Sequence, residues 1–291
     1  MPLRIEDYAL IGDCETAALV GRDGSVDWAC WPRFDSDACF AALLGTADHG
    51  RWRVAPFGPV RRTSRRYSGD TLVLETRFET DRGAAKVIDF MPPRVGASSM
   101  VRMIQGESGT VGMCMDLAVR FGYGARVPWI DRQEDDTLRI VAGADQLVLK
   151  AGAPVVARDN RVECDFAVSA GETVAFTLTY APSHLPPPQA MDPSKALAAT
   201  RHFWEAWARK TSVAPGERHH AITRSLITLK ALTYAPTGGM VAAPTTSLPE
   251  TLGGIRNWDY RFCWLRDATL TLLALMNAGY YDEAQAWRDW L

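Results

Sequence analysis

The sequence contains no long apolar run and almost no excess of one charge sign. Its longest apolar stretches fall far short of the about 18 residues that a membrane-spanning helix needs. Residues 1–7 lack the charged-then-apolar pattern of a secretion signal. A formal net charge of −2 without a basic stripe argues against a nucleic-acid or anionic-membrane partner. We therefore expect a cytoplasmic protein that binds neither nucleic acid nor membrane.

The residue spacings of metal and redox sites are also missing. None of the six cysteines has a partner at C-x-x-C spacing, which argues against a zinc or thiol-redox motif. The sequence has no glycine-rich phosphate loop, no metal-ligand cluster and no Ser/His/Asp signature. We expect no metal and no cofactor. We interpret the cysteines as buried free thiols: Cys14, Cys30, Cys39, Cys114, Cys164 and Cys263.

Apolar and aromatic residues, by contrast, are plentiful. The length of 291 residues predicts about two domains, and a hydrophobic content of 47% is ordinary for a protein with a sizeable core. The ten tryptophans are the one unusual feature of the composition. Tryptophan fills protein cores, but its flat ring also stacks well on the apolar face of a sugar.

Residues 1–182 show the alternation that is typical of β-strands. The turn Arg22-Asp23-Gly24 separates two apolar runs, as in a β-hairpin. Apolar residues then occupy every second position within 71–80, 113–121 and 174–180. Strict alternation favours antiparallel strands with one buried face, and many short strands between turns favour a sandwich. We predict an N-terminal antiparallel β-sandwich domain over residues 1–182.

The period changes to helical after a proline-rich break at residues 186–188. Asp192 followed by Pro193 predicts the start of a linker helix, because Asp caps helices and Pro fits their first position. We assign residues 183–215 to a linker with its helix, and residues 216–291 to a helical domain.

Further helices are predicted inside the helical domain. One covers about residues 217–234, and the next begins near Leu265 and stops at Gly279. The last starts at Asp282, with Gln285 in the capping-box position. Its end is apolar at helical spacing, and three or four helices cannot cover such stripes. We therefore expect more helices to follow and the sequence to be a fragment of a longer protein.

One segment is unusually dense in aromatic and charged residues. Residues 255–268 contain two Trp, one Tyr, one Phe, three Arg and two Asp at a predicted loop-to-helix junction. A structural junction is one interpretation, since Asp near a helix N-terminus is favoured by the helix dipole. A sugar site is the other: Trp264 offers a platform, while Arg266 and Asp267 offer hydrogen bonds to hydroxyl groups.

Two long motifs resemble a known enzyme family. Residues 240–250 and 253–268, which include Trp-Leu-Arg-Asp, resemble glycoside hydrolase family 15, the glucoamylases and the bacterial trehalases similar to them. Parts of residues 5–36 resemble the β-sandwich domain in front of the bacterial trehalase-like members. The resemblance covers nearly the whole chain. It implies a β-sandwich followed by an (α/α)6 barrel, of which residues 216–291 are the first helices.

The resemblance also implies a glycosidase that cuts α-glucosides such as trehalose, maltose or malto-oligosaccharides. It assigns the terminal glucose to side chains of one segment: Trp258, Asp259, Tyr260, Trp264, Arg266 and Asp267.

The catalytic residues of the family are not matched in this sequence. The family inverts configuration with two glutamates, whose carboxyl groups lie about 6.5–9.5 Å apart, and both lie well downstream of the motif. Glu283 is the sole Glu after the motif and is too near it to match either. We therefore expect the general acid and the general base to lie beyond Leu291. This places no catalytic residue within the chain and predicts that the chain alone is inactive.

Two other protein classes remain as alternatives. A non-catalytic sugar-binding module would keep Trp264, Arg266 and Asp267 and dispense with catalysis. A disaccharide phosphorylase with a related α/α barrel would use phosphate as the nucleophile, but the Trp-x-Arg-Asp segment fits that class less well.

Three smaller motifs have structural interpretations. Arg33 and Asp35 fit a turn that leaves a strand; the alternative is that they reach over the barrel mouth and restrict long substrates. His219 and His220 point about 100° apart on a helix and cannot share a ligand, so we expect one to be solvated and the other partly buried. The basic cluster within residues 61–66 is predicted to be a solvated face before a strand.

Overall fold

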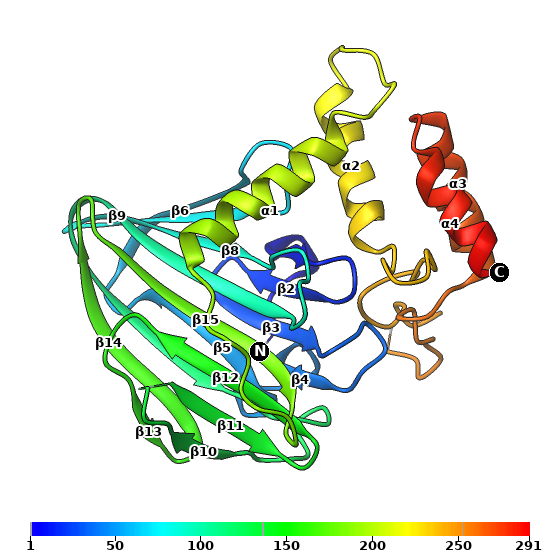
Figure 1. The fold of residues 1–291 in the computed structure, drawn as a ribbon. Helices are drawn as coiled ribbons and strands as arrows, with labels where there is room; N and C mark the ends of the chain where they lie inside the picture. Colours follow the sequence, from blue (N-terminus) through cyan, green and yellow to red (C-terminus); the bar gives the residue numbers. More distant parts are fainter. Residues whose placement is uncertain (1, 136, 252) are drawn as a thin grey trace.

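A β domain is followed by helices that lie along one side of it (Figure 1). The computed structural model describes residues 2–135, 137–251 and 253–291. In these ranges every helix is too short or too polar to cross a bilayer. The same ranges hold no group of three or more His, Cys, Asp or Glu side chains arranged as a metal site requires.

The strands form two antiparallel layers that share one long strand, β9. The first half of β9 pairs with β8 and β15, and its second half pairs with β5 and β14. This arrangement confirms the predicted antiparallel sandwich. The strands are β1 (Tyr8–Gly12), β2 (Ala17–Gly21), β3 (Ser25–Cys30), β4 (Ala38–Phe40), β5 (Arg51–Pro56), β6 (Val60–Tyr67), β7 (Leu74–Thr80), β8 (Gly83–Phe90), β9 (Ser99–Ala118), β10 (Trp129–Arg132), β11 (Leu138–Ala142), β12 (Asp145–Ala151), β13 (Val156–Arg158), β14 (Arg161–Ser169) and β15 (Thr173–Pro182).

Strand β9 passes from one layer to the other at a glycine-rich stretch. Gly109 has a φ of +60°, a left-handed conformation that favours glycine. A Cβ atom at this position would also clash with the carbonyl oxygen of Arg82. The crossing of the long strand therefore depends on a residue without a side chain.

Alternating apolar side chains fill the space between the two layers. Trp52, Phe40 and Phe176 have no exposed surface. A charged pair lies in the same core: Arg102 donates to Asp89 at 2.7 Å and to the carbonyl oxygen of Trp52 at 2.6 Å. Because the buried guanidinium and carboxylate satisfy each other, the core tolerates both charges.

The α-helices of the described chain are α1 (Pro193–Ala208), α2 (His219–Ala231), α3 (Leu265–Asn277) and α4 (Tyr281–Trp290), and three short 3-10 helices lie in the β domain at Ile5–Asp7, Ala42–Leu44 and Ala47–His49. The predicted start of α1 is confirmed, because the Asp192 carboxylate accepts from the backbone N–H groups of Ser194 and Lys195 at 2.8 and 3.0 Å. The predicted end of α3 is confirmed at Gly279, whose φ is +89°. The N–H groups of Gly279 and Tyr280 close that helix by donating to carbonyls of its last turn.

The predicted starts of two helices are wrong by one or two residues. Helix α2 begins at His219 rather than at about residue 217, and it ends at Ala231 rather than at residue 234. Helix α4 begins at Tyr281 rather than at Asp282. No side chain caps α4, and Gln285 donates to Asp289 at 2.7 Å instead of forming a capping box. The entry of α4 is fixed by packing, since the ring of Tyr280 stacks on that of Trp207 at 4.0 Å.

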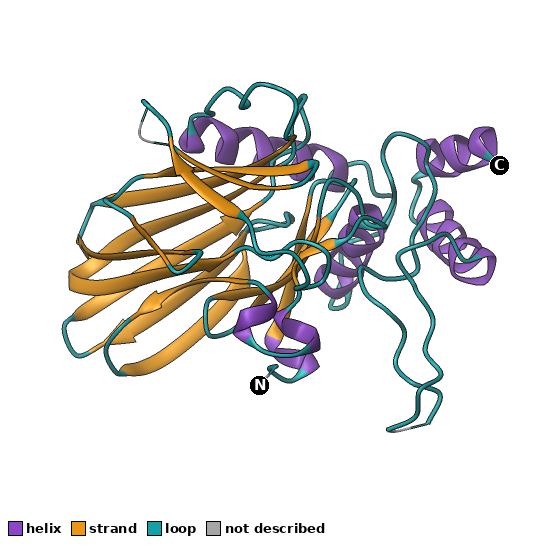
Figure 2. Cartoon of the chain, turned by 90° about the horizontal axis from the view of Figure 1, so that it is seen from below, coloured by secondary structure: helices purple, strands orange, loops and turns teal. Residues whose placement is uncertain are grey.

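The helices pack on the sandwich through a second apolar cluster. Cys14 and Leu72 of the β domain are buried in it together with Trp204 of α1. The guanidinium of Arg224 on α2 lies 4.1 Å from the ring centre of Tyr67 on β6. Figure 2 shows one long helix lying over the strands and the helices near the C-terminus beyond the end of the strands. The two parts therefore meet over a packed surface.

The smaller motifs largely match their structural interpretations. His219 is partly buried and His220 is exposed, as predicted. The basic residues 61–66 lie within β6, which pairs with β7, rather than before a strand. Arg61, Arg62 and Arg66 are exposed, as predicted for a solvated face. Two of these side chains form ion pairs, Arg66 with Glu75 and Arg61 with Asp81.

All six cysteines are free thiols, as predicted. The predicted burial is confirmed for four of them and is wrong for Cys114 and Cys263, which are partly exposed. Burial raises the pKa of the Cys14 thiol to about 12 and that of the Cys30 thiol to about 11. These buried thiols are therefore protonated and unreactive at neutral pH.

Candidate functional site

The segment that leads into α3 forms an irregular two-stranded ribbon. Bridges pair Val241 with Cys263 and Thr246 with Asp259. The ribbon is tied to the sandwich, because the indole N–H of Trp28 donates to the carbonyl oxygen of Pro244 at 2.7 Å. Short bridges rather than a regular sheet are expected here, since prolines and glycines interrupt the segment.

Arg261 fixes the second strand of this ribbon. Its side chain is 9% exposed and donates to the carbonyl oxygen of Ser36 at 2.7 Å and to the sulfur of Cys30 at 3.4 Å. It also forms a bidentate ion pair with Asp259, with contacts of 3.0 and 2.7 Å. Arg261 therefore joins the candidate site to the β domain.

This ion pair shifts the protonation of both partners. Hydrogen bonds from Arg261 lower the pKa of the Asp259 carboxyl group. Burial lowers the pKa of Arg261, but the ion pair and neighbouring groups outweigh burial and raise it overall. Both groups are therefore charged at neutral pH, and the Asp259 carboxylate faces a protein partner.

Trp264 stands at the N-terminal end of α3 within an aromatic group. Its ring lies 5.2 Å from that of Tyr260 and 6.2 Å from that of Trp258, both edge to face. Its indole N–H donates to the carbonyl oxygen of Asp259 at 2.9 Å. The ring plane is therefore set by the backbone of the residue that Arg261 holds.

Arg266 and Asp267 complete the group on the first turn of α3. They form an ion pair at 3.0 Å, and Arg266 also donates to the hydroxyl oxygen of Tyr260 at 3.3 Å. The bonds to Tyr260 and Asp267 raise the pKa of Arg266. The side chain of Arg266 is 66% exposed and that of Asp267 is 28% exposed. Tyr260 thus links the indole of Trp264 to the charged pair on an open surface.

The structure places the six predicted residues in two different situations. Five lie in the open aromatic and charged group: Trp258, Tyr260, Trp264, Arg266 and Asp267. The sixth, Asp259, turns its carboxylate to Arg261. Arg261 was not among the residues predicted for the site. The available signal was its spacing, because residues i and i+2 of an extended segment share a face.

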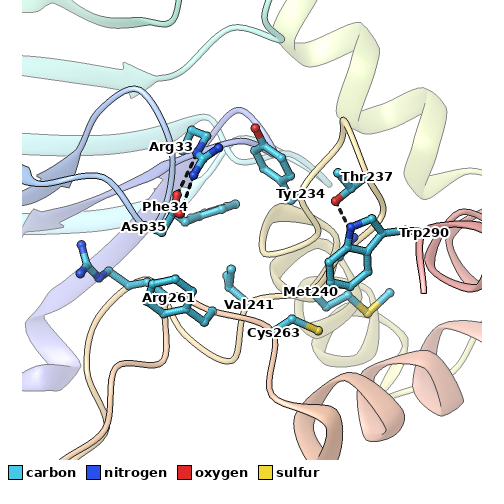
Figure 3. Close-up of a pocket in the computed structure, with 12 residues that line it drawn as sticks. Arg33, Phe34, Asp35, Tyr234, Thr237, Met240, Val241, Arg261, Cys263 and Trp290 are labelled. Atoms are coloured by element: carbon cyan, nitrogen blue, oxygen red, sulfur yellow. Dashed lines mark hydrogen bonds and ion pairs between the residues drawn. The ribbon is translucent and has the colours of Figure 1, made fainter.

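A cavity of about 200 Å³ lies beside this ribbon (Figure 3). Arg33 and Asp35, from the loop after β3, line one side of it. Trp290 of α4 lines the opposite side, and Cys263 lies at its floor. The cavity is therefore built by both parts of the chain.

Glu283 is the only glutamate that follows the Trp-x-Arg-Asp motif in this sequence. It is 6% exposed. Its carboxylate accepts from the indole N–H of Trp207 at 2.7 Å and pairs with Lys230 at 3.0 Å. These contacts hold α1, α2 and α4 together, so Glu283 is part of the helix packing.

Leu291 directly follows α4 and marks the position beyond which both catalytic glutamates are expected. It is 75% exposed. Its backbone N–H donates to the carbonyl oxygen of Trp287 at 3.1 Å, so it still belongs to the last turn of the helix. Leu291 therefore takes no part in the aromatic and charged group at Trp264, and the placement of the acid and base beyond it stays a prediction.

Comparison with known protein families gives two matches along the chain. Residues 1–182 match the family described as trehalase-like, N-terminal, and residues 216–291 match glycosyl hydrolases family 15. A trehalase of Thermoplasma volcanium is 31% identical over 97% of this chain and 46% of its own length. A trehalase of Mycolicibacterium smegmatis is 32% identical over 96% of this chain and 46% of its own length.

A solved structure shares the fold. A bacterial glucoamylase complexed with acarbose matches with a TM-score of 0.69 and 13% identity, over 97% of this chain and 49% of that one. This likeness confirms the predicted order of a β domain followed by helices. The chain spans about half the length of the curated relatives and of the solved structure that it matches.

Proposed function

Because this chain belongs to the trehalase-like members of glycoside hydrolase family 15, we propose that its segment 258–267 binds the terminal glucose of an α-glucoside. Trehalose is the first candidate, since the curated relatives are trehalases. Maltose and malto-oligosaccharides share the same terminal unit. The proposed division is a sandwich over 1–182, a linker over 183–215 and the start of the barrel over 216–291.

The observation that carries this proposal is the arrangement around Tyr260. An indole, a phenol, a guanidinium and a carboxylate lie within contact of one another on a helix N-terminus. A pyranose ring has an apolar face and a rim of hydroxyl groups, so it needs an aromatic platform and both donors and acceptors. Trp264 supplies the platform, and Arg266 and Asp267 supply the polar groups.

The reaction that we propose for this family is hydrolysis of the glucosidic bond with inversion of configuration. It needs an acid on the leaving oxygen and a base that activates water, two carboxyl groups about 6.5–9.5 Å apart. Glu283 is engaged by Trp207 and Lys230 within the helix packing, so it supports neither role. We therefore propose that these 291 residues bind the sugar without cleaving the bond, and that the acid and base belong to sequence beyond Leu291.

Isothermal titration of the chain with glucose, trehalose and maltose tests the proposal. We expect Trp264→Ala and Arg266→Ala each to weaken sugar binding at least tenfold, about 1.4 kcal/mol. Trp129→Ala is the matched control, because this indole is 84% exposed and lies on β10, at the end of the molecule opposite α3 (Figure 1). Unchanged affinity in the Trp264 variant would remove the site. Release of glucose from trehalose by the unmodified chain would instead disprove the absence of an acid and base.

A further inference from the structure

The cavity beside the ribbon is not explained by the site just proposed. None of Trp264, Arg266 and Asp267 lines it, although Cys263 is the neighbour of Trp264 in the chain. Its walls combine aromatic rings with the charged side chains of Arg33 and Asp35. This is the composition of a sugar site rather than of a purely apolar void. Its volume of about 200 Å³ is below that of drug-sized pockets and suits a small ligand such as one pyranose.

Arg33 and Asp35 form a preorganised fork at one wall. Two parallel bonds of 2.9 and 2.6 Å join the guanidinium to the carboxylate. The pair is only partly covered, with the side chains 53% and 28% exposed. Both groups therefore keep free donors and acceptors for a ligand in the cavity.

The loop that carries this fork is held by three hydrogen bonds, two from outside it and one within it. Arg94 donates to the carbonyl oxygen of Pro32 at 2.8 Å, and Arg261 donates to that of Ser36 at 2.7 Å. Within the loop, the backbone N–H of Arg33 donates to the hydroxyl oxygen of Ser36 at 3.1 Å. A loop fixed at both ends loses little conformational entropy when a ligand binds.

The opposite wall is aromatic and closely supported. The Trp290 indole lies against the backbone at Gly239, where an added Cβ would be 3.3 Å from the ring. Tyr234 and Phe262 add further rings to the lining. A flat ring opposite a hydrogen-bonding fork matches the two kinds of surface that a pyranose presents.

The charges at the cavity favour a neutral ligand. Hydrogen bonds to Asp35 raise the pKa of Arg33, so the guanidinium stays charged and is neutralised by its partner. The other guanidinium of the lining, that of Arg261, is paired with Asp259. With both cations paired to carboxylates, an anion such as phosphate would face as much negative as positive charge.

We propose that this cavity is a second binding site for a neutral hexopyranose, with Arg33 and Asp35 of the β domain as its hydrogen-bonding residues. The proposal rests on the proposed function, because that function supplies the sugar. The ligand is either the second ring of a bound disaccharide or a separate free sugar. In both cases the β domain takes part in carbohydrate recognition.

Protection of Cys263 from alkylation tests the proposal, because this partly exposed thiol lines the cavity. The chain is treated with iodoacetamide in glucose, trehalose or inorganic phosphate, and labelling is measured by peptide mass spectrometry. Cys114, the other partly exposed thiol, is the internal control. We expect saturating sugar to slow labelling of Cys263 at least fivefold and to leave Cys114 and the phosphate samples unchanged.

Variants separate this cavity from the site at Trp264. Arg33→Ala should raise the sugar concentration needed for protection at least fivefold, and Tyr234→Phe should raise it less. Arg22→Ala is the matched control, since its ion pair with Asp7 has similar exposure, 49% and 28%. Protection that is unchanged in Arg33→Ala, or that phosphate gives and sugars do not, overturns the proposal.

Arg266→Ala identifies the source of the sugar. If glucose still protects Cys263 in this variant, the cavity holds a free sugar at a separate site. If only trehalose protects, and both Arg33 and Arg266 are needed, the cavity holds the second ring of a bound disaccharide. Failure of the Trp264 titration together with Arg33-dependent protection would reject the proposed function and retain this site.

Discussion

The β domain and the helical part cover their apolar residues to very different extents. Between the two layers of the sandwich, Trp52, Phe40 and Phe176 have no exposed surface. On helix α3, by contrast, Leu270 is 63% exposed and Leu273 is 55% exposed. Two stacked sheets bury each other's inner faces, whereas a helix needs neighbours on every side that is apolar.

Helix α3 shows this most clearly. One side of it packs inward through Ala268 and Leu275, both with no exposed surface. The adjacent side carries Leu265, Leu270 and Leu273, all more than half exposed. Apolar residues over such a wide arc are typical of a helix that is enclosed by others. The described residues cover only one of its two apolar sides.

The candidate site therefore depends on the β domain, which is the better-packed part of the molecule. Arg261 ties the ribbon to Ser36 and Cys30, and Trp28 holds its other strand at Pro244. Contacts from the sandwich thus fix the platform at the N-terminus of α3. We expect the geometry of the site to tolerate changes on the exposed side of α3 better than changes at Arg261.

The largest expected effect is loss of the buried ion pair inside the sandwich. Arg102→Ala leaves the Asp89 carboxylate without its partner in the core, which should lower the free energy of unfolding by about 3–5 kcal/mol. Urea denaturation followed by circular dichroism measures the change. Arg22→Ala removes an exposed pair on the same domain and should change it by less than about 1 kcal/mol. Equal effects of the two variants would contradict the contrast between core and surface.

The second prediction compares two leucines on the same helix. Leu275→Ala removes a side chain with no exposed surface and should lower the free energy of unfolding by about 2–5 kcal/mol. Leu273→Ala removes one that is 55% exposed and should stay within about 0.5 kcal/mol of the unmodified chain. Thermal unfolding of both variants checks the difference. A large loss in the Leu273 variant would show that the exposed side of α3 is covered in solution.

The third prediction concerns the connection between the two parts. Arg261→Ala removes the bonds to Ser36 and Asp259 and should lower the free energy of unfolding by about 1–3 kcal/mol. It should also weaken sugar binding, because Trp264 is oriented by the backbone of Asp259. The near-ultraviolet circular dichroism of the coupled aromatic rings reports on the orientation of Trp264, and calorimetric titration measures the sugar affinity.

A conservative variant distinguishes positioning from simple stability. Arg261→Lys retains the charge but cannot form the bidentate fork. It should recover stability more completely than it recovers the aromatic dichroism and the sugar affinity. If both quantities recover together, Arg261 acts only on stability.

Sequence patterns predicted the architecture well where one physical signal dominated. Strict alternation identified the antiparallel strands, and Asp192 and Gly279 identified helix ends because each satisfies backbone groups locally. The predicted start of α4 was wrong because the true start is set by the stacking of Tyr280 on Trp207, two residues that lie far apart in the sequence. Long-range packing leaves no local pattern of this kind.

The candidate site was predictable only in part for the same reason. A motif indicated that Trp264, Arg266 and Asp267 belong together, and the structure brings them together through Tyr260. It could not show that Asp259 faces Arg261, or that Arg33 and Trp290 share a cavity. Both facts depend on how the loop after β3 meets the ribbon, across more than two hundred residues of sequence.

The smallest predicted effect is a pH dependence of the connection at Asp259. Hydrogen bonds from Arg261 lower its pKa in the folded chain below the unfolded value of about 3.9. The pair therefore contributes its full stability above the unfolded pKa and loses it as the pH falls through the folded pKa. Since the Asp259 side chain is 35% exposed, we expect screening to keep this contribution below about 1 kcal/mol. Urea denaturation at pH 7 and pH 3 should show a larger loss in the free energy of unfolding for the unmodified chain than for Asp259→Asn.

A carboxyl carbon NMR titration of Arg261→Gln tests the cause of this shift. It should find the pKa of Asp259 raised towards its ordinary value, and an unshifted titration would show that Arg261 is not the cause.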